Sequence, residues 1–165
     1  MIGLFIGRFQ PFHKGHLKFV LYALSQVDKL IIGIGSSQEK YTEENPFTAE
    51  ERADMIERTL KKEGIDKKRY EIIQIPDIRC DEKWVSHVKN LTPKFDIVYC
   101  SNPRDKKLFE EAGYEVREIG RYKNINATAI REEMLKDGKW EELVPEPVIE
   151  KIREIDGVRR VKEIN

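Results

Sequence analysis

The sequence lacks the features that mark secreted, membrane-spanning or disulfide-stabilised proteins. It holds two cysteines, Cys80 and Cys100, and no CxxC pair, so we expect neither a disulfide scaffold nor a structural zinc site. No apolar run approaches the roughly 20 residues of a membrane span, and the opening "MIGLFIGRFQ" meets an arginine too early for a signal peptide. These absences predict a cytoplasmic protein with no membrane partner.

The chain also lacks an excess of charge of either sign. Over 165 residues, 30 lysines and arginines balance 30 aspartates and glutamates. A broad positive surface for nucleic acid is therefore not expected, and any bound anion must be held by a local group of charges. With 39% hydrophobic residues, the length suits a single domain, residues 1–165, with one compact core.

Short apolar segments alternate with amphipathic segments along the whole chain. The alternation, with strands that are apolar throughout, predicts an α/β fold: a doubly wound, largely parallel sheet with helices on both faces. The predicted strands are residues 2–7, 29–37, 70–77, 95–102 and 114–119. The predicted helices are residues 16–27, 48–64, 82–91, 103–113, 129–138 and 145–157, and a C-terminal helical segment of about 139–165 is expected to pack on the domain.

Particular residues are placed to begin or end these helices. Thr48 and Glu51 have the spacing of a capping box at the start of the second helix. We expect Asp81 and Thr128 to cap the helices that follow them, and Gly157 to end the last helix.

The stretch "GRFQPFHKGH", residues 7–16, directly follows the first strand. His13 and His16 are three residues apart, so we expect them on one side of a first helical turn, where unpaired N–H groups and the helix dipole attract anions. Gly15 is expected to leave room for a phosphate between the imidazoles, and Arg8 adds a permanent charge. We interpret the stretch as a cradle for a polyphosphate; metal binding and structural packing are the alternatives.

A second anion site is indicated at "INATAIREEM", residues 125–134, where Arg131 lies in the first turn of a helix. An ordinary capped helix with a solvated arginine is the alternative. Ligands of parallel sheets bind beyond the carboxyl ends of the strands. We therefore expect the opening stretch and the segments "IGSS", "PD" and "CSN" to line one shared crevice.

Together, the two anion-binding segments carry the signature of a known superfamily. His13-Lys14-Gly15-His16 matches its (H/T)xGH turn, and residues 125–131 match its late ISxTxxR-type turn. The chain resembles the HxGH nucleotidyltransferases and, more closely, the archaeal type of nicotinamide-nucleotide adenylyltransferase. The resemblance runs through nearly the whole length, in the segments "GRFQPFHKGHL", "VDKLIIGIGSSQ", "NPFTAEER", "DIRCDEKWVSHV" and "LTPKFDIVYCSNP".

The resemblance implies a Rossmann-like fold and a specific reaction. This is transfer of AMP from ATP to nicotinamide mononucleotide (NMN), which gives NAD and pyrophosphate. It also implies a divalent cation, usually Mg²⁺, held mainly by the ATP phosphates and not by protein side chains. Members of the family are commonly homo-oligomers, and the archaeal type is often a hexamer.

The resemblance also assigns roles to individual residues. His13, His16, Arg8 and Arg131 would be catalytic, with the histidines on the ATP phosphates and the arginines on the outgoing pyrophosphate. The nucleotide-binding set would be Gly7, Arg8, Phe9, Gln10, His13, Gly15, His16, Ser101, Asn102, Pro103, Asn126, Thr128 and Arg131. The acceptor-binding set would be Ser36, Ile78, Asp81 and Trp84, with Trp84 stacked on the nicotinamide ring; a core position is the alternative for Trp84.

Asp81 stands where the family usually has asparagine. An ionised aspartate only accepts hydrogen bonds, whereas an asparagine amide also donates them. Adenylyl or cytidylyl transfer to another phosphorylated acceptor is therefore an alternative, with nicotinate mononucleotide, flavin mononucleotide and phosphopantetheine as candidates. Glu132 and Glu133, which would weaken phosphate attraction, leave open a non-catalytic nucleotide-binding module.

Overall fold

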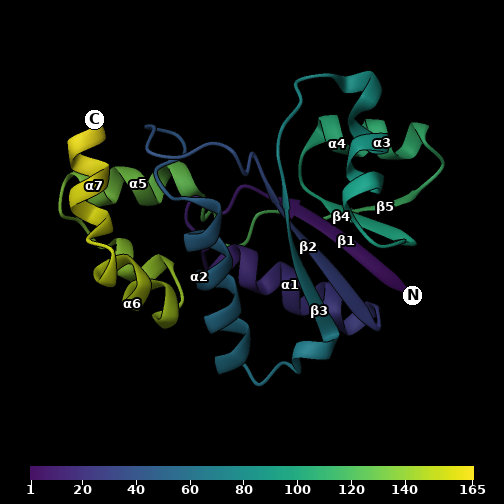
Figure 1. The fold of residues 1–165 in the computed structure, drawn as a ribbon. Coiled ribbons are helices and arrows are strands. Elements are labelled where there is room, and N and C mark those ends of the chain that lie inside the picture. The colour runs from purple at the N-terminus through teal and green to yellow at the C-terminus, as the bar shows by residue number, and fades with distance from the viewer.

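A computed structural model describes all 165 residues. Five parallel strands form one sheet in the order β3-β2-β1-β4-β5 (Figure 1). The strands are β1 (Ile2–Gly7), β2 (Lys29–Gly35), β3 (Tyr70–Ile75), β4 (Ile97–Cys100) and β5 (Glu115–Glu118). The strand order reverses between β1 and β4, so the loops that follow these strands diverge and leave space for a ligand.

Seven α-helices follow or cover the strands. They are α1 (Lys14–Gln26), α2 (Ala49–Lys62), α3 (Asp81–Leu91), α4 (Pro103–Glu111), α5 (Ala127–Leu135), α6 (Glu146–Glu154) and α7 (Gly157–Ile164). Short 3₁₀ helices form at Lys67–Arg69 and Trp140–Leu143. None of the helices combines the length and the apolar character that a membrane crossing requires.

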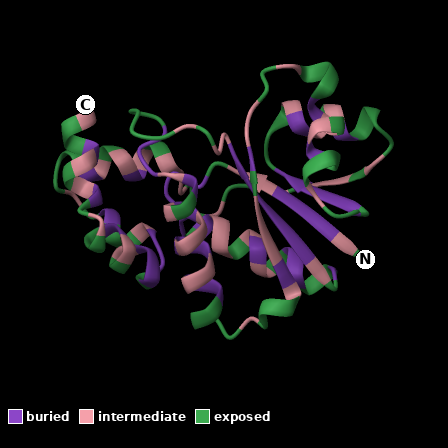
Figure 2. Cartoon of the chain, viewed as in Figure 1, coloured by how far each residue is buried: buried purple, intermediate pink, exposed green.

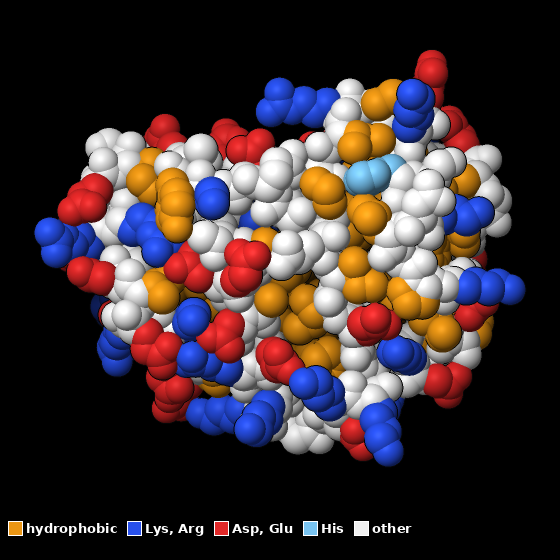
Figure 3. Space-filling view, viewed as in Figure 1, with side chains coloured by type: hydrophobic (Ala, Val, Ile, Leu, Met, Phe, Trp, Pro, Cys, Tyr) orange, Lys and Arg blue, Asp and Glu red, His pale blue; other side chains and the backbone are white.

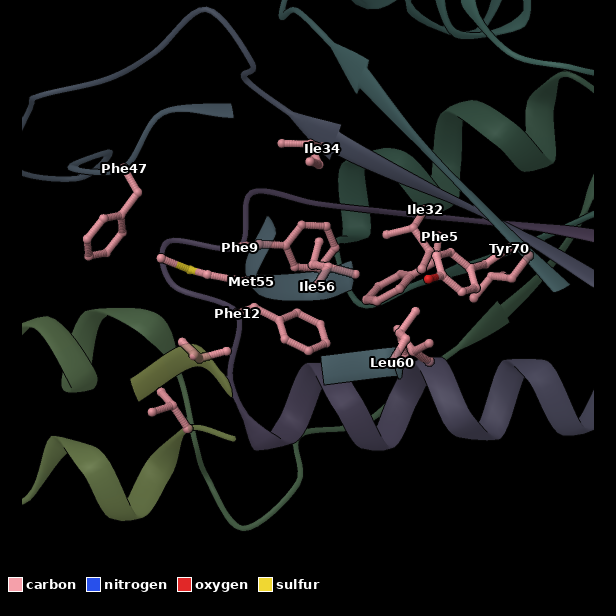
Figure 4. Close-up of a cluster of buried hydrophobic side chains, with 14 of the residues drawn as sticks. Phe5, Phe9, Phe12, Ile32, Ile34, Phe47, Met55, Ile56, Leu60 and Tyr70 are labelled. Carbon is pink, nitrogen blue, oxygen red and sulfur yellow. The ribbon is translucent and has the colours of Figure 1, made fainter. Parts of the chain in front are cut away.

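The sheet divides the apolar interior into two clusters, in place of the single core expected from the length. Phe5 and Ile32 join a cluster of 25 buried residues beside α1 and α2, while their neighbours Leu4 and Ile31 join a cluster of eight beside α3 and α4. Figure 2 shows β1 and β2 buried along most of their length, and Figure 4 shows Phe5 and Phe12 between the strands and α1. Helices on both faces of the sheet are thereby confirmed.

The C-terminal segment contains two helices, α6 and α7, where the sequence predicted one. α6 lies against α2 and α7 against α5 (Figure 1). Asp156, with a φ of 53°, ends the first of them, and Gly157 begins α7. The expectation that Gly157 ends the last helix is wrong. The glycine is needed for packing, since a Cβ there would lie 3.0 Å from Ile152 and 3.1 Å from Phe47.

Ion pairs on the surface tie the C-terminal segment to the rest of the chain. Arg58 of α2 binds Glu154 at 2.8 Å, and Lys62 binds Glu146 at 2.6 Å. Each such exposed pair contributes only about 0–1 kcal/mol to stability. Basic and acidic side chains are interspersed over the face in Figure 3, in keeping with the balanced charge of the sequence.

The helix caps confirm one sequence expectation and correct two. Thr48 and Glu51 form the expected capping box at α2. Asp81 is instead the first residue of α3 and makes no cap. At α5 the cap is Asn126, whose extended backbone lets its side chain accept the N–H three residues on at 2.8 Å. Thr128 therefore lies inside the first turn and does not cap it.

Candidate active site

A cavity of about 730 Å³ lies at the carboxyl ends of β1, β2 and β4. Its walls come from the segment after β1, the end of β2, the turn between β4 and α4, and the chain from Ile119 to Arg131. Segments far apart in the sequence thus form one crevice. This confirms the expectation for "IGSS", "PD" and "CSN", which contribute Ser36, Asp77 and Asn102.

Most of the predicted site residues line this cavity. They are Gly7, Arg8, Phe9, Gln10, His13, Gly15, His16, Ser36, Trp84, Ser101, Asn102, Asn126, Thr128 and Arg131. Three others do not line it: Pro103, Ile78 and Asp81. Pro103 is the first residue of α4, and Asp81 forms an ion pair with Arg104. For these three, the structure does not support the predicted contact.

His13 and His16 lie against one another at the start of α1. Their ring centroids are 3.5 Å apart and the rings are tilted by 17°. The His13 backbone N–H donates to Nδ1 of His16, and the His16 backbone N–H donates to Nδ1 of His13, each at 3.2 Å. No space is left for a phosphate between the imidazoles, so that expectation is wrong. Both residues line the cavity.

The reciprocal hydrogen bonds determine the protonation of these imidazoles. Since each Nδ1 accepts a backbone N–H, the ring proton of a neutral histidine must lie on Nε2. Burial lowers the pKa of His13 to about 4 and lowers the pKa of His16 well below its usual value, with the neighbouring His13 adding to the second effect. In the free protein the pair is therefore neutral near pH 7 and offers two N–H donors.

Gly15 is required by this arrangement rather than by a ligand. A Cβ at this position would lie 2.9 Å from Cε1 of His13. A larger residue would require the His13 ring, which takes part in the reciprocal cap, to shift. The glycine in the motif thus keeps the two imidazoles stacked.

The two arginines predicted to bind phosphate converge on the same crevice. Nη1 of Arg131 donates to the Gln10 carbonyl at 2.9 Å, which fixes the start of α5 beside the start of α1. The pKa of Arg131 is lowered mainly by burial and also by the nearby Arg8. Glu44, which the sequence analysis missed, lies 3.9 Å from Arg8 on the cavity wall.

Arg52 is the most deeply buried charged residue and was also missed. Its side chain is fully buried beneath the crevice, and no carboxylate pairs with it. It donates to five backbone carbonyls at 2.9 to 3.3 Å, those of Arg8, Gly35, Ser36, Glu39 and Thr48. One guanidinium thus joins the loops after β1 and β2 to α2. The sequence feature that could have revealed the burial of Arg52 is its position on the same side of α2 as Ala49, Ile56 and other apolar residues.

Trp84 belongs to the smaller apolar cluster and is only 4% exposed. The Arg104 guanidinium lies 5.3 Å from the centre of its ring, and Nε of Arg104 donates to Asp81 at 2.7 Å. The indole touches the cavity but is covered, so stacking on a substrate ring requires Arg104 to move. In this structure Trp84 is a core residue, which was the alternative to a stacking role.

Asp105, in the first turn of α4, is a further cavity residue that the sequence analysis missed. Its Oδ1 atom and Nε1 of Trp84 are both buried, and the two side chains face one another with no other hydrogen-bond partner in the protein. Nη1 of Arg104 is 3.9 Å from Oδ1, beyond hydrogen-bond range. Burial raises the pKa of Asp105, while the neighbouring guanidinium and the indole N–H act in the opposite direction.

The cavity holds neither an activated thiol nor a metal-ligand cluster. Burial raises the pKa of Cys100 to about 11, so this thiol is protonated near pH 7, and it does not line the cavity. No group of three histidine, cysteine, aspartate or glutamate side chains is placed to hold a metal ion. What the site offers is a pair of neutral imidazoles, two guanidinium groups and the N-termini of α1 and α5, a set suited to an anion.

Comparison with known proteins agrees with this chemistry. Residues 4–133 match the model of the cytidylyltransferase-like family, so the protein is a nucleotidyltransferase of that class. A nicotinamide-nucleotide adenylyltransferase of Thermoplasma acidophilum is 52% identical over 162 residues, which cover 97% of this chain and 89% of the relative. One of Ignicoccus hospitalis is 51% identical, with 100% and 98% covered. The chain belongs to the nicotinamide-nucleotide adenylyltransferase family.

The solved structures show the same fold. A bifunctional NMN adenylyltransferase/ADP ribose pyrophosphatase of Francisella tularensis, complexed with AMP and a manganese ion, aligns with a TM-score of 0.76 and 28% identity. The alignment covers 99% of this chain and 51% of that one, so the chain spans about half of the bifunctional protein. A structure described as a putative nicotinate-nucleotide adenylyltransferase of Vibrio parahaemolyticus, 16% identical with a TM-score of 0.68, shares the fold.

Proposed function

We propose that this nucleotidyltransferase transfers AMP from ATP to NMN, giving NAD and pyrophosphate. The observation that carries the proposal is the convergence of His13, His16, Arg8 and Arg131, from two segments far apart in the sequence, on one cavity of about 730 Å³. That volume lies in the range of small-molecule sites. The family names of the archaeal relatives support NMN as the acceptor.

The proposed reaction is a direct in-line displacement at the α-phosphorus of ATP. The acceptor phosphate supplies an anionic oxygen as nucleophile, so no protein base is needed to activate it. This oxygen bonds to the α-phosphorus as the bond to the bridging oxygen breaks, and the electron pair leaves with pyrophosphate. The protein then contributes by positioning the reactants and by stabilising charge.

The charge that grows on the leaving pyrophosphate meets groups that are already in place. The Nε2–H donors of His13 and His16 and the N–H groups at the start of α1 would contact phosphate oxygens. Arg8 and Arg131 would bind the outgoing β- and γ-phosphates. Arg131 donates to the Gln10 carbonyl, and the Gln10 amide exchanges two hydrogen bonds with the Phe47 backbone, so Arg131 needs little reorganisation.

A divalent cation fits this site as a partner of the phosphates. Single carboxylates such as Glu44 line the cavity, but no three potential metal ligands are grouped together. The cation, Mg²⁺ or Mn²⁺, would therefore be bound mainly by the triphosphate, where it supplies neutralisation of phosphate charge. A homo-oligomer and a cytoplasmic location remain predictions from the sequence.

The purified chain should be assayed with ATP and Mg²⁺ against a panel of acceptors. We expect NMN to support formation of NAD and pyrophosphate in equal amounts. CTP in place of ATP, and nicotinate mononucleotide, flavin mononucleotide or phosphopantetheine in place of NMN, test the alternative transfers. Tight ATP binding without pyrophosphate release from any acceptor would instead establish a nucleotide-binding module.

A further inference from the structure

The C-terminal helix α7 contacts two segments that form the phosphate side of the cavity. It packs against α5, the helix whose first turns carry Arg131 (Figure 1). Through Arg160 it also binds the loop between β2 and α2, which contributes Glu44 to the cavity wall. Nothing in the proposed phosphate chemistry uses Arg160, so its contacts call for an explanation of their own.

Arg160 makes a two-point ion pair that is largely shielded from water. Its Nη1 and Nη2 atoms donate to the two carboxylate oxygens of Glu51, at 2.6 and 3.0 Å, and Nη1 also donates to the Pro46 carbonyl at 3.3 Å. The side chains of Arg160 and Glu51 are only 21% and 14% exposed. The guanidinium also lies 5.0 Å from the centre of the Tyr41 ring. A bidentate, shielded pair fixes its partners more firmly than an exposed ion pair does.

The loop that Arg160 binds has few other hydrogen bonds. Residues 40–46 make one hydrogen bond to a group outside the segment, and that is the bond from Arg160 to the Pro46 carbonyl. Two more join Thr42 and Asn45 within the loop, at 3.1 and 3.2 Å. The buried guanidinium beneath the crevice binds carbonyls on either side of the segment but none within it. Loss of Arg160 would therefore leave the hydrogen bonds of this loop entirely internal.

A short chain of contacts leads from Arg160 to a group expected to bind phosphate. Pro46 precedes Phe47, whose N–H and carbonyl exchange hydrogen bonds with the side-chain amide of Gln10 at 2.9 and 3.0 Å. The Gln10 carbonyl in turn accepts Nη1 of Arg131 at 2.9 Å. A shift of the loop at Pro46 would therefore move Gln10, and with it the partner that fixes the Arg131 guanidinium.

We propose that Arg160 is a positioning residue for ATP: by holding the loop of residues 40–46, it keeps Gln10 and Arg131 in the geometry that receives the triphosphate. The inference rests on the proposed function, which assigns Arg131 to the phosphates of ATP. Arg160 does not line the cavity and so acts only through these partners. Because α7 has no hydrogen bond or ion pair with α3, which carries Trp84, we expect a larger effect on ATP than on NMN.

The test is the Kd of ATP with Mg²⁺, measured by titration calorimetry without acceptor in Arg160→Met. We expect the Kd to rise by about fivefold or more, as for other substitutions that act through a chain of contacts. In turnover assays the KM for ATP should rise similarly, and the KM for NMN at saturating ATP by less than about twofold. Arg160→Lys should give a smaller rise than Arg160→Met, because an ammonium can still bind Glu51 but lacks the fork that also reaches Pro46. Unfolded molecules in a preparation change neither constant.

Arg159→Met is the matched control. It removes the same charge from the neighbouring position of α7, but the Arg159 side chain is 72% exposed and pairs with Asp156 and Glu163, close to it in the sequence. We expect this control to leave the Kd of ATP unchanged. An equal rise in Arg159→Met would show a general effect of charge and would overturn the inference.

Gln10→Met tests the route from Arg160 to Arg131. This substitution removes both side-chain hydrogen bonds to Phe47, so adding Arg160→Met to it should change the Kd of ATP by less than about twofold. An unchanged Kd in Arg160→Met alone, equal rises in both KM values, or an Arg160 effect fully retained beside Gln10→Met would overturn the inference. A wild-type chain that binds ATP but makes no NAD would refute the proposed function instead, and the calorimetric test of Arg160 would stand.

Discussion

Arg52→Met is the substitution for which the structure gives the clearest magnitude. The guanidinium lies fully buried and donates to five backbone carbonyls around the crevice. Methionine keeps much of the apolar stem but removes every donor. Five carbonyls then lose their partner, and the loops after β1 and β2 lose their common attachment to α2.

The expected loss of stability is about 4 kcal/mol. Burial lowers the pKa of Arg52 to about 10, which corresponds to about 3 kcal/mol against the charged form. Hydrogen bonds from a charged donor contribute about 1.5 kcal/mol each at the low end of their range, so the five together exceed that penalty by about 4 kcal/mol. Such a loss is a large share of the free energy of unfolding of a folded domain, which is typically about 5–15 kcal/mol.

Urea unfolding followed by circular dichroism measures this loss directly. Arg58→Met is the matched control on the same helix, because Arg58 makes only partly exposed ion pairs with Asp54 and Glu154. We expect that control to cost about 1 kcal/mol or less. Arg52→Lys should restore part of the stability while still raising the KM for ATP, because a single ammonium cannot join both loops. A loss below about 1 kcal/mol in Arg52→Met would refute this account of the buried guanidinium.

The remaining predictions concern the histidines and Trp84. His16→Ala should lower kcat by about 100-fold or more with folding retained, as measured by NAD formation; near-wild-type turnover would remove His16 from the mechanism. The free energy of unfolding should fall as the pH drops from about 6.5 towards 4, because the histidines of the unfolded chain bind protons in this range and the buried pair does not. A free energy of unfolding that stays constant over this range in chemical denaturation would contradict the lowered pKa values. Trp84→Phe should raise the KM for NMN far more than the KM for ATP; equal changes in both constants would leave Trp84 a core residue alone.

Much of the fold was determined by local patterns in the sequence. The alternation of strands with helices, and the apolar character of β1, β2 and β4, predicted a parallel sheet covered on both faces, and the structure has it. The errors lie at helix ends and in the number of apolar clusters. Asn126 and Thr128 are both good capping residues, and only the backbone conformation of the folded chain decides between them.

The site divides in the same way. Residues in two short motifs, His13, His16 and Arg131 among them, were visible in the sequence because their spacing along the chain sets their spacing on a helical turn. The buried Arg52 and the contact between Asp105 and Trp84 were not visible, because each depends on contacts between elements far apart in the sequence. The spacing of residues along the chain determines which groups a helix end presents. Tertiary packing alone decides which of these groups are buried away from water, and burial in turn sets their pKa values and their hydrogen-bond partners.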